Sequence, residues 1–279
     1  KKSKDPTLII APTSLLMNWK RELEGFAPSL DVEVYHGTKR KLLKNERDVI
    51  LTTYDIVQRE VGELKKGNWA LIILDEAQNI KNPNSKRARV IKGLSAVGRV
   101  ALTGTPVENR LQELWSIMDF LNPGLLGSAE FFRKNFALPI EKYRNRESLA
   151  KLRKAIAPFI LRREKKDKKV ITDLPGKIIP NEYCHLTPEQ AALYQKIVDG
   201  TWEKIENSAG MERRGLVFKL FTMLKQVCNH PVQYTKKGNP ASPASGKAAK
   251  TMELLNRIRE RKDKVLIFTQ FREMGLYLQ

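Results

Sequence analysis

The segment that most constrains the fold of this chain is a run of apolar residues that ends in two carboxylates. Residues 70–74 read Ala-Leu-Ile-Ile-Leu, and Asp75 and Glu76 follow directly. A strand without polar alternation is covered on both faces, which is typical of a central strand in a parallel α/β sheet. Ligands of such sheets bind just beyond the carboxyl ends of the strands. The segment therefore predicts that both carboxylates lie where a ligand would bind.

Two interpretations of Asp75 and Glu76 compete. One carboxylate can hold Mg²⁺, largely through the waters of the ion, while the other orients the attacking water of a phosphoryl transfer. Alternatively, the pair caps the next helix, because carboxylates interact favourably with the positive end of a helix dipole. The two residues by themselves favour neither interpretation, so the choice depends on the rest of the chain.

Further apolar segments alternate with helical patterns along the chain. Beside residues 70–74, we expect buried strands at residues 7–12, 32–35, 47–53, 99–106 and 264–269. Strands that alternate with helices predict an α/β fold, a doubly wound parallel sheet whose polar strand ends lie along one edge. The last strand stands apart from the others, and a sheet needs three or more strands or a covering layer for independent stability.

Charge is the compositional feature that bears most on function. The 279 residues include 51 Lys and Arg against 31 Asp and Glu, a formal net charge of +20. Such an excess indicates a polyanionic partner, nucleic acid before a membrane surface. Half of the excess lies in residues 131–169, where Arg162 and Arg163 directly follow an apolar triplet and are expected to be anchored to structure. No apolar run approaches the roughly 18 residues that span a bilayer, so no membrane partner is expected.

Cysteine, histidine and tryptophan give weaker signals. Cys184 and Cys228 make no disulfide framework, which indicates a reducing intracellular compartment. Their neighbours His185 and His230 would complete a Cys₂His₂ set, but each pair is too tightly spaced for usual zinc ligands, and a structural role is expected. Core packing rather than base stacking is expected of three tryptophans on apolar helical stripes: Trp19, Trp115 and Trp202.

Three sequence blocks indicate a family by their residues and by their order along the chain: residues 74–82 (LDEAQNIKN), 101–109 (ALTGTPVEN) and 264–271 (KVLIFTQF). They resemble the Walker B box (motif II), motif III and motif IV of the Swi/Snf family of DNA-dependent ATPases, in helicase superfamily two. Residues 11–19 and 51–54 resemble motif Ia and the neighbouring DNA-facing block of that family. The resemblance covers essentially the whole chain and implies a RecA-like sheet with helical insertions, followed by the start of a second RecA-like lobe.

The resemblance assigns roles to individual residues. Asp75 would hold the Mg²⁺ of ATP and Glu76 would polarise the hydrolytic water, while Thr103 and Thr105 would relay the nucleotide state to the DNA track. The residues expected at the nucleotide are Asp75, Gln78, Thr103, Gly104 and Thr105. The residues expected to face DNA are Ser14, Thr53, Lys81, Asn82, Arg162, Arg163 and Gln270. The implied partner is double-stranded DNA, contacted through its phosphate backbone without sequence specificity, with a protein on that DNA as a candidate cargo.

The resemblance also divides the chain into four parts. These are a truncated first RecA-like ATPase lobe (1–127), a basic helical insertion with its return segment (128–182), a helical segment that opens the second lobe (183–252), and the first strand region of that lobe (253–279). The expected location is cytoplasmic and nucleoid-associated in a prokaryote, and nuclear in a eukaryote.

One element of an ATPase of this class does not occur in these 279 residues. A Gly-x₄-Gly-Lys-[Ser/Thr] loop is needed, because its amides cradle the phosphates. Gly176-Lys177 is followed by Ile178, and Gly246-Lys247 by Ala248, so neither pair forms such a loop. In the family this loop precedes motif Ia, and motifs V and VI follow motif IV. We therefore expect the chain to be an internal piece of the ATPase that hydrolyses little or no ATP by itself.

The leading hypothesis is part of an ATP-driven motor that moves along or remodels duplex DNA. Two alternatives share the same features. In the first, the chain is a non-catalytic DNA-binding or scaffold module, in which Asp75 and Glu76 are a relic Walker B box and the basic helices bind DNA. In the second, the sheet belongs to a strand-separating helicase or an RNA-directed enzyme.

Overall fold

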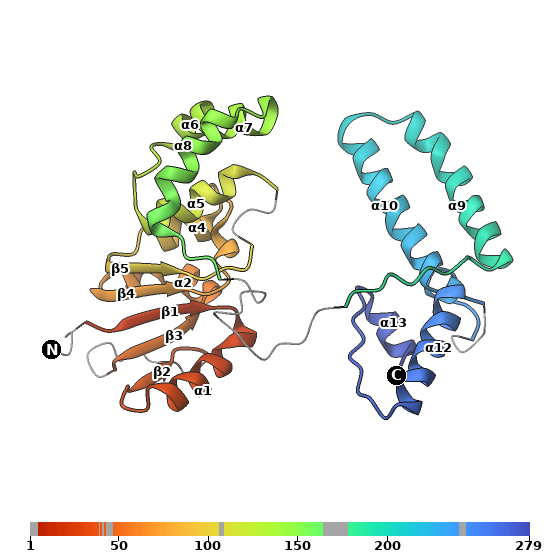
Figure 1. Cartoon of the computed structure of the whole chain (residues 1–279), viewed down its shortest axis with the longest axis horizontal. Helices are drawn as coiled ribbons and strands as arrows, with labels where there is room; N and C mark the ends of the chain where they lie inside the picture. Colours follow the sequence, from red (N-terminus) through yellow and green to blue (C-terminus); the bar gives the residue numbers. More distant parts are fainter. Residues whose placement is uncertain are drawn as a thin grey trace. The chain divides into compact units, whose positions relative to one another are not determined.

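The computed structural model describes residues 5–38, 40, 42, 47–105, 109–163, 178–239 and 244–279. It divides into two compact units, Lys1–Thr172 and Asp173–Gln279, which we describe separately. The first unit contains a five-stranded sheet with helices, and the described residues of the second form helices joined by extended segments (Figure 1).

The sheet of the first unit is parallel throughout. Its strands are β1 (Thr7–Ala11), β2 (Val32–Val34), β3 (Val49–Thr53), β4 (Trp69–Leu74) and β5 (Ala96–Ala101). They lie in the order β2-β3-β1-β4-β5, and Ile10 of β1 pairs with Thr52 on one side and Leu74 on the other. The predicted parallel α/β fold is therefore confirmed, with the carboxyl ends of the strands at one edge.

Helices cover both faces of this sheet, as a parallel sheet requires. They are α1 (Leu16–Phe26), α2 (Tyr54–Arg59), α3 (Val61–Lys65), α4 (Lys86–Lys92) and α5 (Leu111–Leu121), with two 3-10 turns, η1 (Thr13–Leu15) and η2 (Ala77–Ile80). Alternate residues of β1 point to opposite faces. Ile9 and Ala11 pack with α1, whereas Leu8 and Ile10 join the larger core with α2, α4 and α5.

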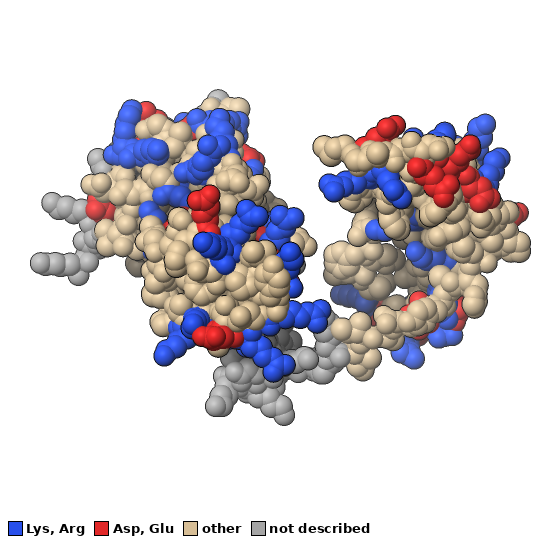
Figure 2. Space-filling model, turned by 90° about the horizontal axis from the view of Figure 1, so that it is seen from above, with Lys and Arg blue, Asp and Glu red and all other residues tan. Residues whose placement is uncertain are grey.

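A smaller helical layer follows α5. It consists of α6 (Ala129–Phe132), the π-helical turn η3 (Arg133–Ala137), α7 (Leu138–Tyr143), α8 (Arg146–Ile156) and the 3-10 turn η4 (Ala157–Phe159). Trp115 of α5 packs with Phe132 and Leu152 in its core, which confirms core packing for this tryptophan. Every Lys and Arg between residues 133 and 163 is exposed, and several groups of Lys and Arg side chains lie on the visible face of this unit (Figure 2).

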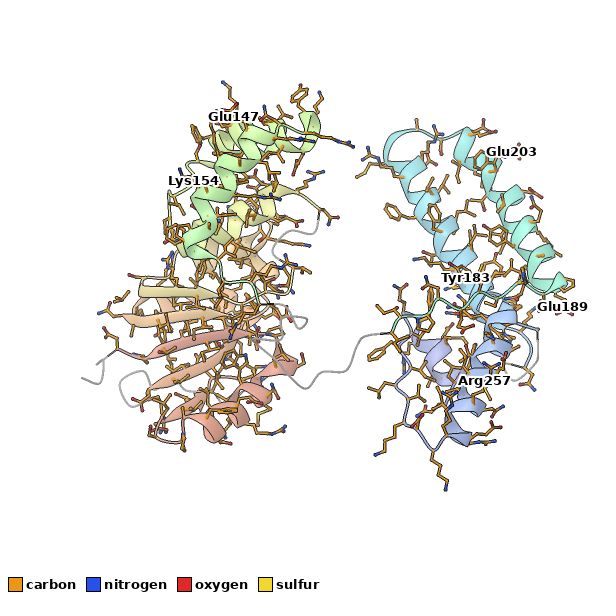
Figure 3. All side chains as sticks on the ribbon, in the orientation of Figure 1. Glu147, Lys154, Tyr183, Glu189, Glu203 and Arg257 are labelled. Carbon is orange, nitrogen blue, oxygen red and sulfur yellow. The ribbon has the colours of Figure 1, made fainter. Side chains whose placement is uncertain are left out.

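The second unit is built around a helical hairpin. Its helices are α9 (Pro188–Glu206), α10 (Gly210–Asn229), α11 (Pro231–Thr235), α12 (Gly246–Glu260) and α13 (Arg272–Tyr277). A capping box of Thr187 and Gln190 begins α9, and Glu189 and Glu203 lie near its two ends (Figure 3). The buried Gln190 amide also donates to the Val227 carbonyl of α10 at 2.7 Å, which ties the hairpin together.

Two sequence predictions for this unit are wrong. Residues 264–269 form no strand, and Leu266 and Phe268 are 83% and 89% exposed. The physical reason is that a strand must satisfy its backbone groups through a partner, and residues 178–239 and 244–279 contain no strand for it to pair with. Trp202 is 53% exposed and donates to Glu206 of its own helix, whereas Ile197 and Ile205 occupy the buried side of α9.

The zinc alternative finds no support in the structure. Cys184 is exposed, whereas His230 is 1% exposed and its Nδ1 accepts a hydrogen bond from the Val232 backbone N–H at 3.2 Å, which caps α11. The expected structural role of His230 is thus confirmed. The described residues contain no group of three or more His, Cys, Asp or Glu side chains suited to a metal ion.

None of the helices described is both long and apolar enough to cross a membrane.

We predict that Ser116→Ala lowers the free energy of unfolding by about 1–3 kcal/mol, because the fully buried Ser116 hydroxyl donates to the Ile80 carbonyl at 2.6 Å and its loss leaves that carbonyl without this donor. Chemical denaturation of the purified chain measures the change. The matched control is Ser95→Ala at an exposed serine, which we expect to stay within about 0.5 kcal/mol of the wild type. Equal effects of both substitutions would contradict the role of the Ser116 hydrogen bond.

Candidate nucleotide site

The candidate site begins where the chain turns sharply after β4. Glu76 has φ 53° and ψ 54°, the left-handed region that non-glycine residues rarely adopt. Backbone hydrogen bonds hold this turn from both sides: the Asp75 N–H donates to the Ile10 carbonyl of β1, and the Ala77 N–H donates to the Leu102 carbonyl after β5, both at 2.9 Å. The neighbouring strands therefore impose the conformation that presents the two carboxylates.

Side chains from neighbouring segments also hold the turn. The Tyr54 hydroxyl donates to the Asp75 carbonyl at 2.7 Å, and the Asn79 amide donates to the Glu76 carbonyl at 2.9 Å. Arg87 lies over the Tyr54 ring and donates to the Asn79 side-chain oxygen at 3.1 Å. Burial, and then the nearby Asp75 charge, raise the pKa of Tyr54 well above its usual value. Its hydroxyl consequently stays protonated and remains a donor at physiological pH.

Both carboxylates have defined protein partners. Asp75 Oδ1 accepts from the Glu76 backbone N–H at 2.9 Å, and Asp75 Oδ2 accepts from the Trp19 indole N–H at 2.7 Å. Glu76 Oε2 accepts from Gln78 Nε2 at 2.5 Å, and Gln78 Oε1 in turn accepts from the Thr103 hydroxyl at 2.8 Å. A single orientation of the Gln78 amide satisfies both of its bonds. A continuous chain of hydrogen bonds thus runs from Thr103 to Glu76.

The donor set at Asp75 fits a magnesium ion of the kind that accompanies ATP. Each carboxylate oxygen accepts one hydrogen bond from the protein and keeps the capacity to accept another, and Asp75 is half-buried rather than enclosed. The described residues offer no cluster of three metal-ligating side chains. Mg²⁺ needs none, because it keeps several waters and is commonly held by one or two carboxylates together with phosphate oxygens.

The structure brings three of the predicted nucleotide residues together with Asp75 and Glu76 at the carboxyl edge of the sheet. Gln78 and Thr103 are joined by the hydrogen bonds above, and the Thr105 N–H donates to Thr103 Oγ1 at 3.2 Å. Gly104 lies between the two threonines, and both it and Thr105 are exposed. Residues 106–108, which belong to the motif III block, lie outside the described residues.

The residues predicted to face DNA differ in how far they are exposed to solvent. Those that are exposed are Ser14, Asn82, Arg162, Arg163 and Gln270. Gln270 belongs to the second unit, whereas the other four belong to the first. Lys81 is half-buried, with its ammonium 3.9 Å from a Glu113 carboxylate oxygen of α5.

Thr53 requires a correction. Its side chain is 3% exposed, and its hydroxyl accepts from the Ile56 backbone N–H at 3.3 Å, so it serves as the N-cap of α2. A buried capping hydroxyl is not presented to a phosphate, and we remove Thr53 from the DNA-facing set. The prediction rested on the resemblance of residues 51–54 to a DNA-facing block of the Swi/Snf family. A threonine at the end of a strand equally fits a helix N-cap when a helix follows at once.

Sequence reasoning missed the residues that support the two carboxylates. Tyr54 directly follows β3, so the rule that strand ends converge at one edge could have identified it. Trp19 was predicted to pack in the core, and it does pack against the cluster of β1 and β3 residues. Its indole N–H nevertheless reaches Asp75, and no periodicity in the sequence indicates such a contact. Asn79 acts on a backbone carbonyl and likewise gives no sequence signal.

Comparisons with known proteins identify the family to which this chain belongs. The SNF2-related domain family matches residues 1–233. YwqA of Bacillus subtilis (strain 168), whose name describes an ATP-dependent helicase/translocase, is 43% identical over 98% of this chain and 31% of its own length. The ISWI chromatin-remodeling complex ATPase ISW2 of Saccharomyces cerevisiae is 33% identical over 97% of this chain and 25% of its own length. The chain thus spans about a third or less of these relatives.

A solved structure with the same fold is the Sulfolobus solfataricus SWI2/SNF2 ATPase core in complex with dsDNA. Its sequence is 46% identical to that of this chain, and the two structures match with a TM-score of 0.59. The match covers 98% of this chain and 58% of the Sulfolobus chain. The family match over most of the chain, the parallel sheet and the Asp75–Glu76 turn lead to one conclusion: this chain belongs to the SNF2 family of helicase-like ATPases.

Proposed function

We propose that the chain is part of an ATP-driven motor that moves along double-stranded DNA, with Asp75 and Glu76 at the site of ATP hydrolysis. The observation that carries the proposal is the hydrogen-bond chain from Thr103 through Gln78 to Glu76. A relic site would have no need to orient this carboxylate through two successive side chains. A helix-capping role does not explain the orientation of this carboxylate either, because Glu76 is the N-cap of η2 and makes no side-chain cap hydrogen bond.

Each residue has a distinct part in the proposed reaction. Asp75 would hold the magnesium ion of ATP through its waters, and that ion neutralises charge on the phosphates. Gln78 occupies Oε2 of Glu76 and leaves Oε1 to accept a proton from the attacking water. Thr103 orients the Gln78 amide. Since Thr103 lies two residues after the end of β5, a movement of that segment would change the position of the Glu76 carboxylate.

Charge and similarity support duplex DNA as the track. The chain has a net charge of +20, and the basic side chains of residues 133–163 are exposed. The similar Sulfolobus ATPase core is in complex with dsDNA in its solved structure. Contacts to phosphates fit movement along DNA, because they position a protein without reading sequence. Binding should accordingly weaken steeply as salt concentration rises.

We predict that Glu76→Gln in the full-length gene product lowers ATP hydrolysis by about a hundredfold or more and leaves duplex DNA binding unchanged, because the amide cannot accept the proton of the attacking water. Phosphate release and fluorescence anisotropy of labelled DNA measure the two properties. A scaffold module with a relic Walker B box would lose neither. Unchanged ATP turnover in this variant would remove Glu76 from the catalytic role.

Thr103→Val tests the hydrogen-bond chain, because valine keeps the shape of threonine and removes the hydroxyl. We expect the ATPase kcat of the full-length gene product to fall by about tenfold as Gln78 and Glu76 lose their fixed orientation. The control is Thr222→Val on the exposed face of α10, where the hydroxyl donates only within its own helix. A wild-type kcat in Thr103→Val would contradict the proposed link.

Residues 1–279 purified alone should release little or no phosphate from Mg-ATP, with or without duplex DNA. The reason is that the sequence contains no Gly-x₄-Gly-Lys-[Ser/Thr] loop to hold the phosphates. A coupled phosphate assay measures the rate, with the full-length gene product as the positive control. DNA-stimulated release by the isolated residues would show that another segment binds the phosphates.

A further inference from the structure

Trp19 is placed unlike the other tryptophans of the chain. Its indole N–H donates to Asp75 Oδ2 at 2.7 Å, across 56 positions of sequence. By contrast, Trp69 and Trp115 donate to nearby backbone carbonyls, and Trp202 donates to an exposed glutamate of its own helix. Among the tryptophans of the described residues, Trp19 is the one whose indole N–H donates to a residue of the candidate nucleotide site.

Packing alone does not account for this contact. The Trp19 ring lies against the apolar cluster of β1 and β3, a role that phenylalanine could also fill. An indole N–H that becomes buried needs an acceptor, and here the acceptor is the carboxylate proposed to hold magnesium. The bond is a charge-assisted one, and such bonds are short and strong.

The two hydrogen bonds on Asp75 together determine how its carboxylate lies. The Glu76 backbone N–H holds Oδ1 and the Trp19 indole N–H holds Oδ2. With one donor on each oxygen, rotation of the carboxylate breaks at least one bond. Groups that hydrogen-bond a metal-binding carboxylate typically change metal affinity or activity by about 10- to 100-fold when they are removed.

We propose that Trp19 is a positioning residue of the nucleotide site: its indole N–H fixes the Asp75 carboxylate in the orientation that receives the hydrated magnesium ion of ATP. This inference rests on the proposed function. It gives α1, which starts directly after η1, a part in metal binding that acts through Asp75. The helix is therefore more than a cover for the sheet.

The test compares Trp19→Phe with Trp115→Phe in the full-length gene product. Both substitutions remove an indole N–H from the first unit, but the Trp115 N–H donates to the Gly127 carbonyl, away from the site. We expect Trp19→Phe to raise the Mg²⁺ concentration for half-maximal ATPase activity by about tenfold. Trp115→Phe should leave it unchanged.

A binding measurement separates metal affinity from turnover. Electron paramagnetic resonance titration of Mn²⁺ in the presence of a non-hydrolysable ATP analogue should show about tenfold weaker metal binding in Trp19→Phe. Binding of the same analogue without metal should not change. If Trp19→Phe folds poorly, 3-benzothienylalanine at position 19 keeps the bicyclic shape without the N–H, and it should show the same weaker metal binding.

The outcomes distinguish this inference from the proposed function. Wild-type metal dependence in a folded Trp19 variant would overturn the positioning role while leaving the ATPase proposal intact. An equal loss of metal affinity in Trp115→Phe would overturn the positioning role as well, because the effect would then not depend on the contact with Asp75. Absence of both ATP hydrolysis and metal-nucleotide binding in the wild-type gene product would overturn the proposed function, and this inference with it.

Discussion

The candidate site depends on the hydrogen bonds that hold the turn after β4 between two other strands. The Asp75 N–H is held by β1 and the Ala77 N–H by the end of β5, so Glu76 adopts a left-handed conformation that costs of order 1–3 kcal/mol in isolation. The turn can persist because the parallel sheet places three strand ends side by side. The positions of the two carboxylates therefore depend on the topology of the sheet.

Strands β1 and β4 could be predicted from the sequence because they are largely continuous apolar runs, which can be recognised without knowledge of their neighbours. By contrast, β5 contains Arg99 and covers Ala96–Ala101 rather than the predicted residues 99–106. The carboxyl edge followed from the rule that parallel strands end at one edge, and Glu76, Gln78 and Thr103 do meet there. The left-handed Glu76 and the Trp19 contact could not be predicted, because tertiary partners impose both. Thr53 was predicted to face DNA, but its hydroxyl caps α2 instead, since a hydroxyl at a strand end can cap a helix as well as face a ligand.

The failed strand at residues 264–269 has the same cause. Its apolar run, residues 265–268, resembles that of β4 but is shorter, and these residues stay exposed and form no strand. An apolar pattern shows that a segment could form a strand, but the strand forms only where a neighbouring strand pairs with it. Residues 178–239 and 244–279 contain no such partner. The helical hairpin of α9 and α10 forms because each helix satisfies its own backbone groups and packs against its neighbour in the sequence, to which the Gln190 amide joins it. The two units thus differ in how far each segment depends on distant partners.

The most direct measurement of the central claim is ATP hydrolysis by the full-length gene product with duplex or single-stranded DNA of equal length. A duplex-tracking SNF2 motor should be stimulated strongly by the duplex and weakly by the single strand, and raised salt should reduce the stimulation as phosphate contacts weaken. Equal or greater stimulation by single strands would favour a strand-separating enzyme. Absence of ATP hydrolysis with either DNA would contradict the assignment of Asp75 and Glu76 to a working nucleotide site.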